Sequence, residues 1–257
     1  MKNVVVMTAV EVPGMEERAI PYKYGIASFK KWCEKNNCEL FVLDTALHEN
    51  DIMRINFHRY YAFELLDQSG IEYDQICITD ADAIIHPDCP NFFEMTDGKY
   101  TVTSCDGSFD WIFRSLENYS KYVFEKQTFP FWKYFNAGFQ VVNKNHRHLW
   151  DELINFYFTN QELIVSMQKN FGVGTDQPVI NYIVNLSDTE TKYLPYEFCM
   201  ADLVRKEILD LNFTFLNFNG IYQFNAIPQE IKKKYDIDFW MKSSYEKLYG
   251  KYSENKK

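Results

Sequence analysis

Short apolar runs and helical patterns alternate along the first part of this chain, at the spacing of strand–helix–strand units. Each run is compact and rich in residues that favour buried strands. Strands that are separated by helices form a parallel sheet with helices on both of its faces. We therefore predict an α/β fold with a mostly parallel central sheet. The predicted strands lie at 4–10, 39–43, 75–79 and 100–103, and the helices between them lie at 17–36 and 56–66.

The second part of the chain has less regular patterns. Residues 109–132 are aromatic and irregular, and we expect helix and loop there, over a site. A further strand is predicted at 138–142, and further helices at 147–158 and 178–184. Most of the 22 Phe and 18 Tyr residues are expected to fill the core, and a few could line a carbohydrate site.

No internal repeat and no long linker divides the sequence. We therefore predict one domain over 1–235, followed by an amphipathic helix and tail over 236–257. The apolar run near the N-terminus is too short for a signal peptide or a membrane span, and no other stretch is long enough. We expect a cytoplasmic protein without a transmembrane segment.

The net charge limits the partners of the chain. There are 27 Lys and Arg residues against 36 Asp and Glu residues, a formal net charge of −9. Such a chain is not attracted as a whole to nucleic acid or to anionic membranes, so we expect no nucleic-acid partner. An anionic substrate would need a metal ion or a local basic patch. The sequence leaves the oligomeric state open.

Asp80 and Asp82 directly follow the third predicted strand. Ligands of open parallel sheets bind beyond the carboxyl ends of the strands. Residues two apart on an extended chain point the same way, and two carboxylates so close require a cation or a proton. Mg²⁺ or Mn²⁺ would fill that need and keep sites open for diphosphate oxygens, while the small Ala81 lets a ligand approach. The alternative is that one Asp caps the next segment and the other is solvated.

Four segments, taken in their order, resemble one family of enzymes. Residues 78–85 resemble the Asp-x-Asp strand of GT-A glycosyltransferases, and 135–143 resemble a segment of their galactosyltransferase and glycogenin-like branch. Residues 174–181 are similar to the start of that branch's Asp-Gln helix, and 221–228 resemble its closing motif imperfectly. The resemblance implies a GT-A, Rossmann-like fold. It also implies a hexosyltransferase that moves a sugar from a nucleoside diphosphate sugar, of which UDP-sugar is the family's usual choice, to a hydroxyl of a glycan or glycoconjugate acceptor.

The same resemblance assigns residues to the nucleotide. Thr8 and Ala9, at the end of the first strand, match the place where the family holds the base and ribose. Tyr24 and Arg59 lie on the following helices and could stack on the nucleotide or pair with it. The alternative for Arg59 is an ordinary solvated residue on a helix surface.

Other matching positions belong to the sugar and to catalysis. Asn136, Ala137 and Gly138 provide a backbone that can approach a sugar and a carboxamide that can read hydroxyls, and Asp106 would help to orient it. Asp176 and Gln177 match catalytic positions. Asp176 could be the general base of an inverting reaction or a sugar contact in a retaining one, or the pair could simply begin a helix.

The chain departs from the family at the third metal ligand. The closing motif normally supplies a histidine, but Gln223 occupies that place here and the last histidine is His148. An amide oxygen can bind Mg²⁺ or Mn²⁺. Either Gln223 is a ligand, or the metal depends on Asp80 and Asp82 with diphosphate and water.

Two other functions fit parts of the sequence. The altered third ligand would suit a nucleotide-sugar binding protein with impaired turnover. Residues 80–84 also come close to the pattern of haloacid-dehalogenase-like phosphatases. In those enzymes the pair ends the first strand and a later Gly-Asp-x-x-x-Asp motif completes the metal site. Here two predicted strands come first and no such motif follows, so the phosphatase is the weaker alternative.

Overall fold

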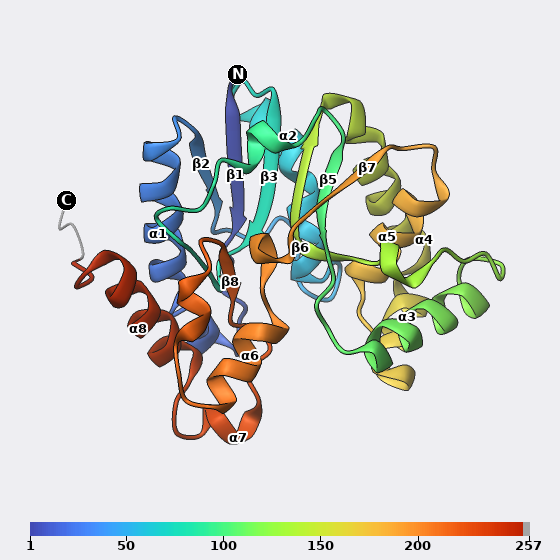
Figure 1. Cartoon of the computed structure of the whole chain (residues 1–257). Coiled ribbons are helices and arrows are strands. Elements are labelled where there is room, and N and C mark those ends of the chain that lie inside the picture. Colours follow the sequence, from blue (N-terminus) through green and yellow to red (C-terminus); the bar gives the residue numbers. More distant parts are fainter. Residues whose placement is uncertain (254–257) are drawn as a thin grey trace.

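A six-stranded sheet forms the centre of the computed structural model, which describes residues 1–253 (Figure 1). Its strand order is β2-β1-β3-β6-β5-β7. All neighbouring strands are parallel except β6, which runs antiparallel to β3 and to β5. The prediction of a mostly parallel sheet is therefore confirmed. The strands are β1 (Asn3–Thr8), β2 (Glu39–Leu43), β3 (Gln75–Asp80), β5 (Tyr100–Ser104), β6 (Phe135–Asn143) and β7 (Thr191–Leu194).

Helices cover both faces of the sheet, as predicted. Successive residues of a strand point to opposite faces, so β1 places Val4 and Val6 in one core and Val5 and Met7 in the other. The first core includes residues of α2 to α5, and the second includes α1. The helices are α1 (Tyr22–Lys35), α2 (Ala62–Gln68), α3 (Phe109–Tyr122), α4 (Arg147–Phe171), α5 (Asp176–Leu186), α6 (Asp202–Leu209), α7 (Gln229–Lys232) and α8 (Ile237–Tyr249).

Several helix boundaries differ from the sequence-based prediction. The first helix begins at Tyr22 and not at residue 17, because Pro21 precedes it and residues 16–18 form a separate 3-10 turn. The predicted helix at 56–66 is a 3-10 helix (Ile55–Tyr61) followed by α2. Helix α4 continues to Phe171 through a break at Asn160.

A second, two-stranded sheet connects the C-terminal part to the Asp-x-Asp segment. Strand β4 (Ala83–Ile85) pairs antiparallel with β8 (Ile221–Gln223), so that Ala83 lies opposite Gln223. Residues that are 140 positions apart in the chain thus become neighbours directly after Asp82.

Helix α8 packs against α1 and β4 and does not extend away from the rest of the chain. Its Trp240, Met241 and Tyr245 share a core with Ile84 and Tyr222. Residues 254–257 of the predicted tail lie outside the described residues. Among helices of residues 1–253, none combines the length and apolar character that a membrane crossing requires.

Candidate active site

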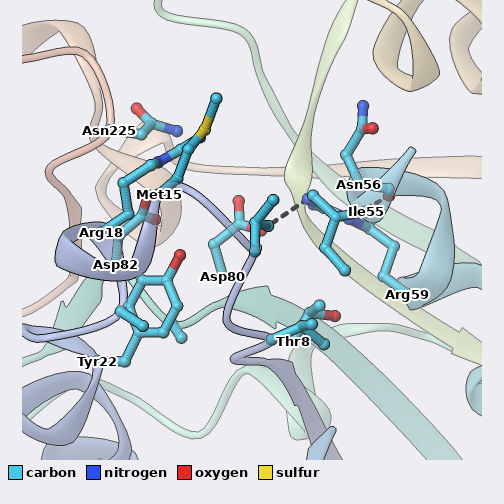
Figure 2. Close-up of a pocket in the computed structure, with 14 residues that line it drawn as sticks. Thr8, Met15, Arg18, Tyr22, Ile55, Asn56, Arg59, Asp80, Asp82 and Asn225 are labelled. Atoms are coloured by element: carbon cyan, nitrogen blue, oxygen red, sulfur yellow. Dashed lines mark hydrogen bonds and ion pairs between the residues drawn. The ribbon is translucent and has the colours of Figure 1, made fainter. Parts of the chain in front are cut away.

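A cavity of about 160 Å³ opens at the carboxyl ends of β1 and β3 (Figure 2). Thr8 ends β1 and pairs in register with Asp80, the last residue of β3, so the parallel strands bring both to one edge. Asp82 follows two residues later. The lining consists of Thr8, Val10, Val12, Met15, Arg18, Ala19, Tyr22, Ile55, Asn56, Arg59, Asp80, Ala81, Asp82 and Asn225.

Arg59 forms a buried ion pair with Asp80 on one side of the cavity. Its Nη2 lies 2.7 Å from Oδ1 of Asp80, and its Nη1 donates to the carbonyl of Ala137 at 3.2 Å. Burial lowers the pKa of the guanidinium, but the carboxylates of Asp80 and Asp176 outweigh it and hold that pKa above its ordinary value. The expected nucleotide contact Arg59 therefore lines the cavity with its charge already opposed by a carboxylate.

Asp82 lies on the other side of the cavity without an equivalent partner. Its Oδ1 is buried and has no hydrogen-bond partner within the described residues. Burial and the nearby Asp80 carboxylate raise the pKa of the Asp82 carboxyl group to about 7, although Arg18 partly opposes this. Burial and Asp82 also raise the pKa of the Tyr22 hydroxyl to about 12, so this hydroxyl remains a neutral donor.

Gly138 allows two polar side chains to meet next to the cavity. A β-carbon at this position would lie 2.3 Å from Nε2 of Gln223 and 2.7 Å from Oδ2 of Asp80. Any other residue would therefore force the side chain of Gln223, of Asp80 or of both to move. Oδ1 of Asn136 accepts a hydrogen bond from the Gly138 amide at 2.8 Å and fixes this close approach.

Asp176 is buried among three donors at the start of α5. Its Oδ1 accepts a hydrogen bond from Nδ2 of Asn56, and its Oδ2 accepts one from the Tyr60 hydroxyl at 3.5 Å. Nε of Arg59 lies 3.9 Å from the same Oδ2. Burial raises the pKa of this carboxyl group against the opposing effect of Arg59. Arg59 thus stands between the two carboxylates of Asp80 and Asp176.

Gln177 and Asp106 connect the neighbouring segments. Oε1 of Gln177 accepts a hydrogen bond from the Ala137 amide at 3.1 Å, and its Nε2 donates to Sγ of Cys105 at 3.5 Å. Oδ2 of Asp106 accepts two backbone hydrogen bonds of 2.8 Å at the start of α6, and its Oδ1 is buried without a partner in residues 1–253. Burial raises the pKa of Asp106. Neither residue belongs to the cavity lining.

Two residues that were predicted to contact the nucleotide also lie outside that lining. Tyr24 is buried with its ring centroid 6.0 Å from that of Tyr245 and 5.1 Å from that of Tyr252. Ala9 is buried, and its amide donates to the carbonyl at the end of β2 at 2.8 Å. The tyrosine that lines the cavity is Tyr22. Residues two apart on a helix differ by about 200° in direction, so Tyr22 and Tyr24 face opposite ways.

Arg18, Asn56 and Asn225 line the cavity but were not predicted from the sequence. Arg18 lies in the loop after β1, and such loops at the carboxyl ends of strands commonly contact ligands. Asn225 follows Gln223 by two residues, the spacing that places side chains on one side of an extended segment. The positions of Arg18 and Asn225 in the sequence could have indicated that they line the site, whereas nothing in the sequence distinguishes Asn56.

A larger cavity of about 540 Å³ adjoins the first and shares Val10, Val12 and Ile55 with it. Small-molecule sites typically enclose roughly 300–1,000 Å³ with mostly apolar walls. His58 is buried in this wall, and its Nε2 has no hydrogen-bond partner within the described residues. Burial lowers the pKa of His58 to about 4, so the imidazole is a neutral polar group in an apolar cavity.

The side chains at the smaller cavity suit a hard divalent cation. Asp80 and Asp82 provide carboxylate oxygens, and the carboxamide of Gln223 lies next to Asp80. Mg²⁺ and Mn²⁺ prefer such oxygen donors, and the unpartnered Oδ1 of Asp82 is an acceptor that a cation would satisfy. In residues 1–253, no cluster of three or more His, Cys, Asp or Glu residues could hold a metal. A cation here would therefore depend on two carboxylates, one carboxamide and oxygens from its ligand.

Comparison with known proteins identifies the fold. No protein-family profile matches the sequence, and no curated protein matches it. Among solved structures, the chain is similar to a glycosyltransferase involved in the glycosylation of the major capsid of PBCV-1. The two share 8% sequence identity with a TM-score of 0.62, over 95% of this chain and 100% of the other. The chain thus has the Rossmann-like α/β fold of a glycosyltransferase.

Proposed function

We propose that this protein is a metal-dependent glycosyltransferase that moves a hexosyl group from a UDP-sugar to a hydroxyl of a glycan or glycoconjugate. The observation that carries the proposal is the position of Asp80 and Asp82 in one cavity at the carboxyl edge of the sheet, with the Gln223 side chain next to Asp80 at Gly138. The similarity in fold to a glycosyltransferase supports it. In this proposal Asp80, Asp82 and the Gln223 carboxamide hold Mn²⁺ or Mg²⁺.

The two adjoining cavities offer places for the two parts of the nucleotide: the smaller one for the diphosphate and the larger one for the nucleoside. A bound divalent ion stabilises the negative charge that develops on a leaving diphosphate. Arg18 and the neutral Tyr22 hydroxyl line the same cavity and can donate to diphosphate oxygens. The adjoining cavity is large and apolar enough for the nucleoside, and Thr8 lines the smaller cavity beside it. The sugar would then lie on the side of Asp80 where Gly138 and Asn136 are found.

The contacts of Asp176 favour a positioning role in this reaction. Its carboxylate already accepts hydrogen bonds from Asn56 and Tyr60 and lies beside the Arg59 guanidinium. A general base needs an oxygen that can reach the acceptor hydroxyl, and both oxygens of Asp176 already accept hydrogen bonds from side chains of the protein. We therefore favour Asp176 as a residue that orients the sugar, as a retaining reaction would require.

Calorimetric titration with UDP, with and without Mn²⁺, beside a donor-hydrolysis assay, tests the proposal. Wild-type protein should bind UDP more tightly with Mn²⁺ and hydrolyse a UDP-sugar slowly. Asp80→Asn should abolish the Mn²⁺-dependent part of UDP binding, while Asp88→Asn, an exposed residue paired with Lys35, should leave it unchanged. Metal-dependent binding that survives in Asp80→Asn would contradict the assigned role.

A binding protein with impaired turnover is the second candidate. Two observations favour it: Gln223 replaces the expected histidine, and Arg59 already neutralises Asp80. Tight Mn²⁺-dependent UDP binding, with neither hydrolysis nor transfer to any acceptor, would support this candidate. Release of phosphate from p-nitrophenyl phosphate would instead favour the phosphatase alternative.

A further inference from the structure

Four aromatic side chains gather on the surface where α3 begins and β6 is about to begin. Phe109 and Phe113 belong to α3, and Phe131 and Trp132 belong to the 3-10 turn before β6 (Phe131–Lys133). Phe109 is 65% exposed, Trp132 64% and Phe113 43%. We call these four residues the aromatic platform. Large rings are seldom left this exposed in a group unless the surface binds something.

The platform is one connected surface around Phe131. The ring centroid of Phe131 lies 5.7 Å from that of Phe109, 5.3 Å from that of Phe113 and 5.4 Å from that of Trp132. Phe131 itself is half-buried against the main core. The platform is therefore anchored from below and presents its outer three rings to solvent.

Local hydrogen bonds hold both segments of the platform in place. The Ser108 side chain caps α3 by accepting a hydrogen bond from the Trp111 amide at 3.4 Å. The Tyr134 amide donates to the carbonyl of Phe131 at 3.0 Å and closes the turn. A surface with fixed rings loses little conformational entropy when a ligand binds.

Hydrogen bonds connect the segments that carry the platform to residues next to the proposed sugar site. The Cys105 amide donates to the carbonyl of Tyr134 at 2.9 Å, which joins the segment before α3 to the segment before β6. Gln177 contacts both Cys105 and Ala137 and so connects the platform's base to the Gly138 region. In strand order, β5 is two positions from β3, a separation of roughly 10 Å at the usual spacing of strands. Figure 1 places α3 below this carboxyl edge of the sheet.

The charges around the platform indicate a neutral ligand. Asp110 and Arg114 pair with each other at 2.7 Å on α3, and Lys133 follows Trp132 in the chain. An anionic membrane or a polyanion would call for a cluster of cations. A stable protein interface needs about 20–30 residues on each side, far more than this group of rings. A pyranose ring suits it better, because one face carries C–H bonds that are attracted to the electron-rich face of an aromatic ring.

We propose that the aromatic platform binds the acceptor, and that the acceptor is a neutral glycan of two or more sugar units. This proposal rests on the proposed glycosyltransferase function. One unit reaches the Gly138 region while the next stacks on the rings of Phe109 and Trp132. Because the platform lies apart from Asp80 and Asp82, its loss affects acceptor binding and leaves the donor site intact.

Binding to a printed array of neutral oligosaccharides, followed by Trp fluorescence, tests the platform. Trp132 is the one exposed tryptophan of five, all within the described residues, so a bound glycan should protect its fluorescence from acrylamide. Phe109→Ala should weaken binding of the strongest array glycan about tenfold, which corresponds to one stacking contact of about 1 kcal/mol or slightly more. Trp132→Ala should weaken it by a similar factor. Phe239→Ala, a ring on α8 that is 40% exposed, should have no effect.

The outcomes separate this proposal from the proposed function. Mn²⁺-dependent UDP binding should be the same in wild type, Phe109→Ala and Trp132→Ala. Glycan binding that is lost in these variants, in a protein without UDP binding, would support the platform and contradict the glycosyltransferase. No glycan bound by wild type, or equal binding by the variants, would overturn the platform. Protection of Trp132 by phosphatidylcholine vesicles but by no glycan, or dimerisation that Trp132→Ala abolishes, would overturn it as well.

Discussion

The two sides of the Asp-x-Asp cavity carry the same kind of side chain in opposite electrostatic situations. On one side, Asp80 lies 2.7 Å from the guanidinium of Arg59 (Figure 2). Asp176 lies 3.9 Å from Nε of the same arginine. On the other side, Asp82 has a buried oxygen that finds no hydrogen-bond partner among residues 1–253, and burial and Asp80 raise the pKa of its carboxyl group to about 7. The first side holds a buried cation of the protein itself, whereas no ion pair of Asp82 is found within residues 1–253.

This difference indicates which carboxylate is reserved for a ligand. A carboxylate that is already paired contributes to the stability of the fold, because separating it from its cation leaves a buried charge. An unpaired carboxylate in the same cavity lowers stability until a cation or proton arrives. In the proposed function, Arg59 fixes Asp80 in place, and Asp82 supplies most of the attraction for the metal.

Removal of Arg59 should have the largest effect on stability. Arg59→Met would leave the carboxylates of Asp80 and Asp176 buried without a cation, which typically lowers the free energy of unfolding by about 3–5 kcal/mol. Urea unfolding in the presence of EDTA measures this. Arg205→Met breaks a surface pair with Asp202 and should change stability by less than about 1 kcal/mol. If the two substitutions changed stability equally, the buried guanidinium of Arg59 would not stabilise this side of the cavity as we propose.

The two aspartates should respond with opposite signs to the same substitution. Asp80→Asn removes the partner of Arg59 and should lower the free energy of unfolding by about 2 kcal/mol without metal. Asp82→Asn removes an unpaired charge and should raise it by about 1 kcal/mol under the same conditions. Added Mn²⁺ should reverse the order of wild type and Asp82→Asn. If Asp82→Asn destabilises the metal-free protein as much as Asp80→Asn, the proposed division between the two sides is wrong.

Gly138→Ala tests how closely Asp80 and Gln223 must approach. The new methyl group would lie 2.3 Å from Nε2 of Gln223 and 2.7 Å from Oδ2 of Asp80, so one of the two must move. Overpacking of this kind should cost about 1–2 kcal/mol and weaken Mn²⁺-dependent UDP binding. Gly107→Ala is the control, since its methyl group would meet only Sγ of Cys105 at 3.3 Å. Unchanged UDP binding in Gly138→Ala would remove Gln223 from the proposed metal site.

The fold could be predicted from the sequence because its signals are local. The runs at 4–10, 39–43 and 75–79 are short, apolar and regularly spaced, and each contains a strand of the sheet. The antiparallel direction of β6 was not predicted, because a strand's direction depends on the path of the chain between strands. The helix predicted over 17–36 was placed too early, because Pro21 precedes the first turn of α1 and does not lie inside it.

The sequence predicted those features of the site that depend on residues close together in the chain. Asp80 and Asp82 were placed at the sheet edge because they directly follow a strand. Their difference in charge environment was not foreseen, since it depends on Arg59, a residue 21 positions away from Asp80 on another element. The prediction named Tyr24, whereas Tyr22 lines the cavity. The sequence could not distinguish the two, because the face of a helix that remains accessible depends on which elements pack against it.

The free energy of unfolding should fall between pH 7 and pH 5, and we expect His58 to cause part of this loss. His58 is buried, and burial lowers its pKa from an ordinary 6.5 to about 4, so the unfolded chain binds its proton more readily. The contribution of neutral His58 to the free energy of unfolding is therefore fully present above about pH 6.5 and is lost as pH falls toward 4. His58→Asn, which keeps an acceptor for the Leu47 amide, should reduce the loss of unfolding free energy between pH 7 and pH 5 by about 1 kcal/mol. His148→Asn, at an exposed position, should leave that loss unchanged. Asp82 acts in the opposite direction, because its pKa is raised to about 7 in the folded chain and its protonation therefore adds stability as pH falls. Asp82→Asn should enlarge the loss of unfolding free energy between pH 7 and pH 5, and a smaller loss in that variant would contradict the raised pKa.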